Sequence, residues 1–437
     1  MRRTDHFFRT CRIAGLLVLL VICVACGDTF RPVAIPQAST PPNPGALHFV
    51  LVINDNGPAN PGSSTRIDVA GDSNVSVEPA GLTPVHAGIL PNGSRVYIVN
   101  AGEDSLTSFS LISAIVPFTT SLPPGSNPAF VAASDNNNVW VANSATGMVS
   151  QVSSASNAVL QTIAVDSTTS NPIALVATPD GKKLYSINQT GGSGGTGSVT
   201  SINVVDATLN GSPLITGTTP IWGVARSDSN RVYVLNSGSG TISVIDTLSD
   251  TILGDFTVAA GANYMAYDSK LNRIYITNPV ANTLTAFSAT ADPPANPLFT
   301  VPIAANPVSV APLPDGTRIY VGSVAVSGST ATSQVTVLNT IDGSVRTVIP
   351  LTSVATACTS PRFRLSMAAA ASGARVYAAN CDAGSTAIIR TQAETTSSGT
   401  FSADTLVLNM PAPASANTPT GGGNALPQNP VFILSGP

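Results

Sequence analysis

The chain has 437 residues, of which only 10% are charged and 43% are hydrophobic, and it contains 36 Gly and 34 Pro. This composition excludes wholesale disorder, because it supplies enough apolar surface for a large core, and it suits short strands joined by tight turns. The net charge of -4 argues against nucleic acid as a partner, since neutralising phosphates requires clustered Lys and Arg.

The first segment of the chain is a predicted export signal. Arg2, Arg3, Arg9 and Arg12 precede the apolar run IAGLLVLLVICVAC. Such a run is too short for a stable membrane span and is typical of a secretory signal. We therefore predict a signal peptide over residues 1–25, whose removal leaves 15 basic and 22 acidic side chains and a net charge of -7.

The end of this run, Cys23-Val24-Ala25-Cys26-Gly27, resembles the lipobox of bacterial lipoproteins. The resemblance implies cleavage before Cys26 and lipidation of Cys26, although Cys23 stands where Leu is usual. An ordinary signal peptide cut nearby and an uncleaved anchor helix remain as alternatives. Residues 26–46 are rich in Pro and small polar residues, which predicts a linker between the anchor and a domain over residues 47–437.

From residue 47 onward, one strand pattern recurs eight times, with an apolar and aromatic core as in HFVLVIN, RVYIVN and RVYVLN. The residues that end these strands are Asn54, Asn100, Asn143, Asn188, Asn236, Asn278, Ser323 and Asn380. Their spacings of 42 to 57 residues are typical of a propeller blade. The repeats therefore predict an all-β fold, a β-propeller of eight blades. Seven blades is the alternative, if the first or last copy is an appendage.

Each repeat predicts four short strands. Turns such as Pro179-Asp180-Gly181 and Pro314-Asp315-Gly316 precede the aromatic strand, because Pro presets φ, Gly supplies a positive φ and Asp caps the turn. A short apolar strand such as 173–177 comes before the turn. An alternating strand such as 241–246 and a fourth strand such as 251–258 follow the aromatic strand. We therefore expect antiparallel four-stranded blades.

The repeats resemble those of the YVTN family of β-propellers, most closely in RVYVLN (231–236) with TISVID (241–246), and in RIYITN (273–278). The resemblance covers about residues 46–437 and implies a toroid with a central channel. Members of this family are mostly exported or surface proteins of undefined function. A related group of propellers includes lactonases, so the resemblance leaves an enzyme possible.

The two ends of the repeat region predict how the ring closes. The first copy begins with its aromatic-type strand, residues 47–54, and lacks an innermost strand. The tail Asn429-Pro430-Val431-Phe432 is similar to the innermost strands that begin at Asn171 and Asn306. We therefore expect the tail to supply the missing strand of the first blade, which leaves no exposed edge.

Cysteine usage agrees with export. Cys11 and Cys23 belong to the signal and Cys26 takes the lipid, which leaves Cys358 and Cys381 as an even pair in an oxidising compartment. We predict a disulfide between them, with two separate buried thiols as the alternative.

One position of the innermost strands is unusually rich in rings. Two residues after the leading Pro or its equivalent, the eight copies carry His86, Phe130, Ala174, Trp222, Tyr264, Ser309, Ser366 and Phe432. Half of this slot is aromatic in a chain with 5% aromatic residues. Innermost strands line the channel, so the slot predicts a ligand site near one mouth; packing between blades is the alternative.

The sequence contains no convincing catalytic, metal-binding or cofactor-binding constellation. Its acidic residues lie mostly in turns, where capping is a sufficient role; these are Asp135, Asp180, Asp228, Asp268 and Asp315. Arg226 and His86 are the few candidates for chemistry on inner strands.

Three functions follow as hypotheses. The first is a monomeric, lipid-anchored binding or scaffold protein that faces the periplasm or the cell surface and binds a protein, glycan or small molecule through His86, Phe130, Trp222, Tyr264 and Arg226. The second is a lactonase-like hydrolase. The third is a structural component of a surface layer.

Overall fold

A computed structural model describes residues 49–112, 116–166, 170–190, 195–304, 306–358, 363–396, 399–412 and 429–436 of the chain. All of these residues belong to one unit, Leu47–Pro437. The predicted signal peptide, the linker and the lipidation site Cys26 lie outside the described residues. Within the described ranges, no helix has the length and apolarity needed to cross a membrane.

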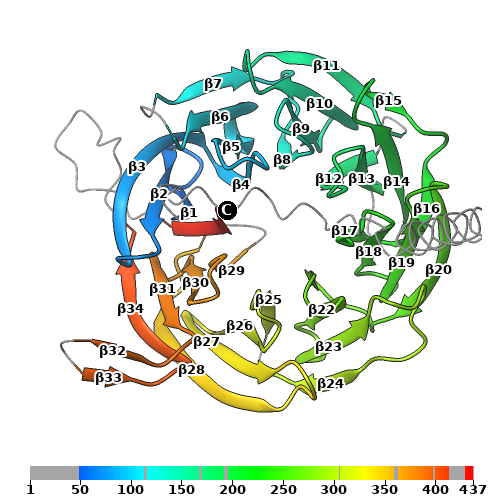
Figure 1. The fold of residues 1–437 in the computed structure, drawn as a ribbon. Helices are drawn as coiled ribbons and strands as arrows, with labels where there is room; N and C mark the ends of the chain where they lie inside the picture. Colours follow the sequence, from blue (N-terminus) through cyan, green and yellow to red (C-terminus); the bar gives the residue numbers. More distant parts are fainter. Residues whose placement is uncertain are drawn as a thin grey trace, which may run out of the picture. The chain divides into compact units, whose positions relative to one another are not determined.

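Eight antiparallel blades stand in a ring, with the first strand of each blade nearest the centre (Figure 1). Blade 1 consists of β35 (Asn429–Ser435), β1 (Phe49–Asp55), β2 (Pro61–Asp68) and β3 (Ser73–Leu82). Blade 2 consists of β4 (Pro84–Ile89), β5 (Arg95–Asn100), β6 (Ser105–Ser110) and β7 (Phe118–Ser121), with the 3-10 turn η1 (Ala101–Glu103) between β5 and β6. Blade 3 consists of β8 (Pro128–Ala133), β9 (Asn138–Asn143), β10 (Met148–Ser153) and β11 (Val159–Ala164).

The next three blades follow the same order from the centre outward. Blade 4 consists of β12 (Ser170–Ala177), β13 (Lys183–Thr190) and β14 (Thr196–Asn203), and its outer edge is divided between β15 (Thr208–Leu209) and β16 (Leu214–Thr218). Blade 5 consists of β17 (Pro220–Ala225), β18 (Arg231–Asn236), β19 (Thr241–Asp246) and β20 (Thr251–Thr257). Blade 6 consists of β21 (Tyr264–Asp268), β22 (Arg273–Asn278), β23 (Thr283–Ser288) and β24 (Phe299–Pro302).

The last two blades carry longer strands and one insertion. Blade 7 consists of β25 (Pro307–Pro312), β26 (Arg318–Ser327), β27 (Thr330–Asn339) and β28 (Val345–Ala355). Blade 8 consists of β29 (Leu365–Ala369), β30 (Arg375–Asn380), β31 (Ser385–Arg390) and β34 (Thr405–Pro411). The hairpin β32 (Glu394–Thr396) and β33 (Gly399–Phe401) is inserted before β34 and projects outward from the ring (Figure 1). The eight-bladed prediction is confirmed, whereas the sequence pattern does not predict this hairpin.

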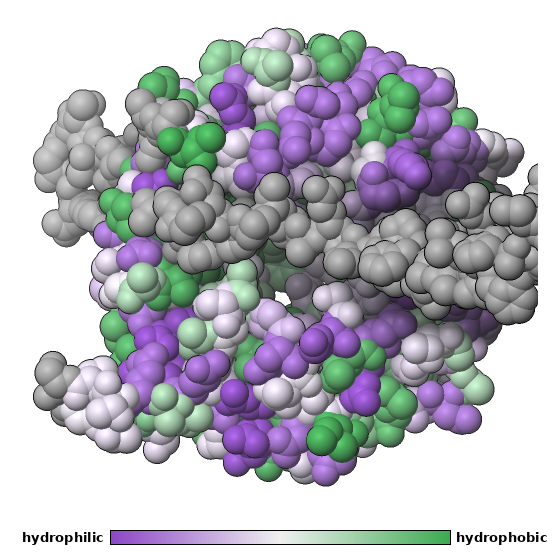
Figure 2. Space-filling view, viewed as in Figure 1, coloured by the Kyte–Doolittle hydropathy of each residue, from purple (hydrophilic) through white to green (hydrophobic). Residues whose placement is uncertain are grey.

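The second strand of each blade forms the core, because it is covered by neighbouring blades on both faces. In β18 every residue after Arg231 is buried, and the same pattern recurs in β5, β9, β22 and β30. The ring at the third position is fully buried in seven blades; these residues are Tyr97, Trp140, Tyr185, Tyr233, Tyr275, Tyr320 and Tyr377. Over the face seen in Figure 2, hydrophilic and hydrophobic residues intermix.

The Asn found at or near the end of the second strand in seven blades has a structural role. Asn100 is fully buried, and its amide donates hydrogen bonds of 2.9 Å to the hydroxyls of Ser105 and Thr107 on the third strand. Asn236 makes the same kind of contact with Ser243, at 2.9 Å. These bonds satisfy a buried polar group at the strand end, which explains why the repeat is recognisable by Asn.

The ring closes as the sequence predicts. Strand β35 pairs antiparallel with β1, with Val50 opposite Ser435 and Ile53 opposite Phe432. The last strand of the chain is therefore the innermost strand of blade 1. The turn prediction is also confirmed, because Gly181 and Gly316 adopt φ values of +69° and +73°.

A disulfide joins Cys358 and Cys381, as predicted. Cys381 is fully buried and directly follows β30, and the Cα atoms of the two residues are 5.1 Å apart. The bond ties the segment before β29 to the end of the second strand of blade 8. A structural disulfide is typical of an oxidising environment outside the cytoplasm.

Candidate functional site

A shared irregularity of the innermost strands positions the predicted ring slot. In β4, β8 and β17 the pairing register shifts between the leading Pro and the slot residue, that is, before His86, Phe130 and Trp222. A similar shift in the pairing of β35 with β1 falls between Pro430 and Phe432. A bulge of this kind bends the strand and re-aims the following side chain. The slot is therefore set by the backbone as well as by the sequence.

The structure brings the slot rings of different blades into contact. His86 stacks on Phe130 with a centroid distance of 3.7 Å and lies 4.3 Å from Phe432 of blade 1. Phe130 meets Trp222 edge-on at 5.7 Å, and Trp222 lies 4.9 Å from Tyr264. Phe130 of blade 3 can touch Trp222 of blade 5 because the slot of blade 4 holds a small alanine.

A sixth ring, that of Phe363, contacts rings at both ends of this row. Phe363 precedes β29, and its ring lies 5.9 Å from Trp222, 6.3 Å from Tyr264 and 5.6 Å from Phe432. It thus bridges the side where blades 7 and 8 carry only serine in the slot. We call these six residues the aromatic cluster; they are His86, Phe130, Trp222, Tyr264, Phe363 and Phe432.

Exposure is unequal within the aromatic cluster. The side chains of His86, Phe130 and Phe363 are buried, with exposed fractions of 5%, 8% and 7%. Trp222, Tyr264 and Phe432 are partly exposed. The cluster therefore has a closed part and a part that solvent reaches, and two of the three partly exposed rings, Trp222 and Tyr264, are neighbours.

The polar groups of the cluster are few. His86 accepts a hydrogen bond at Nδ1 from the backbone N–H of Val131, at 3.4 Å. The small slot residues Ser309 and Ser366 are buried beside the rings, at 2% and 6% exposure. The arrangement is a mainly apolar, ring-lined surface with a few polar atoms, which is the usual chemistry of small-molecule sites.

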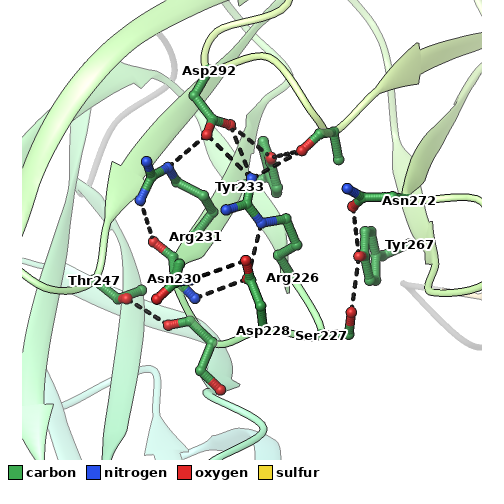
Figure 3. Close-up of polar contacts among 12 residues, drawn as sticks. Arg226, Ser227, Asp228, Asn230, Arg231, Tyr233, Thr247, Tyr267, Asn272 and Asp292 are labelled. Atoms are coloured by element: carbon green, nitrogen blue, oxygen red, sulfur yellow. Dashed lines mark hydrogen bonds and ion pairs between the residues drawn. The ribbon is translucent and has the colours of Figure 1, made fainter. Parts of the chain in front are cut away.

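The structure does not bring Arg226 into the aromatic cluster. Arg226 directly follows β17, whereas Trp222 lies near the start of that strand. The Arg226 guanidinium pairs with Asp228 at 2.9 Å and with Asp292 at 3.1 Å (Figure 3). Burial opposes its charge, but the hydrogen bond to Asp228 and the surrounding charges raise the pKa of Arg226, so it stays protonated.

Figure 3 shows that Asp292 also accepts hydrogen bonds from Arg231 and Tyr233 of blade 5. Asp292 belongs to blade 6, where it lies between β23 and β24, so these contacts join two blades. Among the residues that the structure describes, this arrangement, which we call the interblade clamp, occurs in four pairs of blades. Its members are Lys183, Tyr185 and Asp250; Arg231, Tyr233 and Asp292; Arg318, Tyr320 and Asp404; and Arg375, Tyr377 and Asp72.

The clamp tyrosines act as neutral donors. Burial, and then the hydrogen bond to Asp250, raise the pKa of the Tyr185 phenol well above its ordinary value. Burial and the charge of Asp72 do the same to the pKa of Tyr377. The clamp of Arg375, Tyr377 and Asp72 joins blade 8 to blade 1, so it reinforces the point at which the ring closes.

The acidic residues singled out in the turns have the capping role predicted for them. Asp135 accepts hydrogen bonds from the backbone N–H groups of Asn137 and Asn138, at 2.7 and 2.6 Å. Asp180, Asp228, Asp268 and Asp315 bind backbone N–H groups of their own turns in the same way. In the described part of the chain, no three His, Cys, Asp or Glu side chains gather as metal donors.

Comparison with known proteins adds the fold alone. No model of a known protein family matches the sequence, and no curated protein matches it. A putative 6-phosphogluconolactonase from Bacteroides uniformis is similar in structure, with a TM-score of 0.52 and 15% identity over 70% of this chain and 99% of that one. A periplasmic gluconolactonase from Pseudomonas aeruginosa is similar with a TM-score of 0.50 and 17% identity over 70% of this chain and 96% of that one. Fold and site together define an eight-bladed β-propeller with an aromatic cluster on its innermost strands.

Proposed function

We propose that this protein is a binding protein of the cell envelope whose aromatic cluster holds a small molecule or a carbohydrate. One observation carries the proposal: the ring centroids of Trp222 and Tyr264, from neighbouring blades, lie 4.9 Å apart, and both side chains remain partly exposed at one part of the aromatic cluster. Aromatic faces with a few polar neighbours suit ligands that present flat apolar faces and hydroxyls.

The proposal includes export and anchoring through a lipid on Cys26. The disulfide between Cys358 and Cys381 supports the exported environment. A lipid anchor followed by a Pro-rich linker would hold the propeller at a membrane surface.

A lactonase-like hydrolase is the second candidate. The observation that favours it is the structural likeness to two proteins described as a gluconolactonase and a putative 6-phosphogluconolactonase. At 15–17% identity this likeness concerns the fold, and fold does not imply function. A structural role in a surface layer is a third candidate, and ordered self-assembly would be its sign.

The test is a binding screen on the full-length protein purified in detergent. Tryptophan fluorescence is followed while a panel of neutral and acidic oligosaccharides is added. Of the two tryptophans, Trp140 is fully buried with its N–H bound to Ser134 at 2.9 Å, so ligand should change only the emission of Trp222.

Matched variants separate binding from stability. Measured by calorimetry, because Trp222 is itself the fluorescent reporter, Trp222→Ala and Tyr264→Ala should each abolish binding, whereas Leu248→Ala, at a residue 89% exposed outside the cluster, should leave it unchanged. Unchanged binding in both cluster variants would contradict the proposal. Saturable hydrolysis of gluconolactone by the wild-type protein, in place of binding, would favour the hydrolase.

A further inference from the structure

A groove of about 660 Å³ lies between blades 6, 7 and 8, apart from the aromatic cluster. Its walls include Arg273 of β22, Arg318 of β26 and Arg346 of β28, together with the turn residue Asp315 and the exposed Ile341. A volume of this size is within the range of small-molecule sites. Three arginines in one groove are unusual in a chain with 19 basic side chains among 437 residues.

Arg273 occupies the basic position of an interblade clamp that lacks its acid. In the four complete clamps this position is paired with an Asp of the next blade. Arg273 instead donates a hydrogen bond to the backbone carbonyl of Thr340 in blade 7. Asp342, in the turn that follows Thr340, is the nearest acid along the chain, but it is fully exposed and accepts hydrogen bonds from the N–H and hydroxyl of Ser344. Within the described ranges, Arg273 makes no ion pair with a carboxylate.

The other two arginines of the groove share one carboxylate. Asp404 is 5% exposed at its side chain and accepts from both Arg318 and Arg346, the latter at 3.1 Å. Arg346 is 42% exposed at its side chain, and its Nη1 also donates to the side-chain oxygen of Asn339 at 3.1 Å. The groove is lined by three arginines and Asp315, and two of those arginines pair with the buried Asp404 behind them, so these five groups together carry one excess positive charge.

From this arrangement we infer that the groove binds an oxyanion, a carboxylate or phosphate group carried by a small polar ligand. The guanidinium of Arg presents several N–H donors in a plane and pairs with both groups through two parallel hydrogen bonds. Arg273 would supply the charge that no carboxylate of the described residues neutralises, and Arg346, which lines the same groove, would supply further N–H donors.

Isothermal titration calorimetry on the full-length protein tests the inference. The probes are inorganic phosphate, D-glucuronate as the carboxylate, and D-glucose as the neutral control. We expect saturable binding of phosphate or glucuronate that weakens with added salt, and no binding of glucose. Preference between the two anions identifies the group that the ligand carries.

Three variants locate the binding. Arg273→Gln and Arg346→Gln should each lower the affinity for the anion at least about tenfold, because each variant loses one charge-assisted hydrogen bond. Arg95→Gln is the matched control, because Arg95 holds the same position in blade 2, outside the groove, and donates to the neutral amide of Asn157 at 2.7 Å. Arg346→Gln keeps the test valid if Arg273→Gln fails to fold. The inference would be overturned if the wild type bound neither anion, or if both groove variants bound the anion as tightly as the wild type does.

Discussion

Replacing Asp292 by alanine removes the acid of the clamp that joins blade 5 to blade 6. Its side chain is only 14% exposed and accepts hydrogen bonds from Arg231 Nε at 2.8 Å, Arg226 Nη1 at 3.1 Å and the Tyr233 hydroxyl at 3.1 Å. Hydrogen bonds to charged groups contribute about 1.5–3 kcal/mol each to the free energy of unfolding. The sum over the three bonds is therefore an upper limit on the loss of stability in Asp292→Ala.

The loss is smaller because the three donors keep other acceptors. Arg226 retains Asp228 and the carbonyl of Ala289, Arg231 retains Asp246 at 3.2 Å, and Tyr233 retains the Ala289 carbonyl at 3.3 Å. We therefore expect Asp292→Ala to lower the free energy of unfolding by about 3 kcal/mol, at the low end of the range for removing one partner of a buried ion pair.

Chemical denaturation of the full-length protein, followed by fluorescence, measures this loss. Asp228→Asn is the matched control, because Asp228 pairs with the same Arg226 but is 45% exposed at its side chain, and the amide oxygen can still accept from the backbone N–H of Asn230. An exposed pair contributes about 0–1 kcal/mol. A loss for Asp292→Ala no larger than that for Asp228→Asn would refute the view that the clamps hold the blades together.

Two further predictions concern blade 8. Replacing Cys358 and Cys381 by serine should lower the free energy of unfolding by about 3 kcal/mol, as the chain-entropy model gives for a loop of this length; denaturation midpoints equal to those of the wild type would contradict this. Hydrogen bonds from Arg375 and Arg390 lower the pKa of Glu394 from 4.5 to about 2. Its contribution to stability is therefore complete above pH 4.5 and is lost as the pH falls toward 2, so Glu394→Gln should flatten the acid dependence of the urea midpoint in that window. Parallel pH profiles for the two proteins would show that Glu394 has no such role.

The sequence pattern of the repeats was sufficient to predict the blades, their number and the closure of the ring by β35. These features depend on strand periodicity and turn chemistry, which are local in the sequence. The slot rings were also predictable, because His86, Phe130, Trp222 and Tyr264 hold equivalent positions in successive innermost strands. Phe363 was missed because it precedes the strand of blade 8, outside the aligned slot.

The interblade clamps were not predictable from the repeat. The basic residue and its acid are separated by 67 residues for Lys183 and Asp250, 61 for Arg231 and Asp292, and 86 for Arg318 and Asp404. Turns and insertions of different length cause this variation, so no fixed spacing marks the pair. For the same reason the sequence pattern groups Arg226 with the ring slot, whereas its ion-pair partners are Asp228 in the turn of its own blade and Asp292 in the next blade.

Solvent access to Trp222 is the property on which the proposed binding role depends most directly. Acrylamide quenching of the wild-type protein can be compared with that of Trp222→Phe, in which the fully buried Trp140 is the remaining tryptophan. The proposed role predicts that the wild-type emission contains a readily quenched component that the variant lacks. Equal and weak quenching of the two proteins would contradict it, because the aromatic cluster would then be a closed core that no ligand reaches.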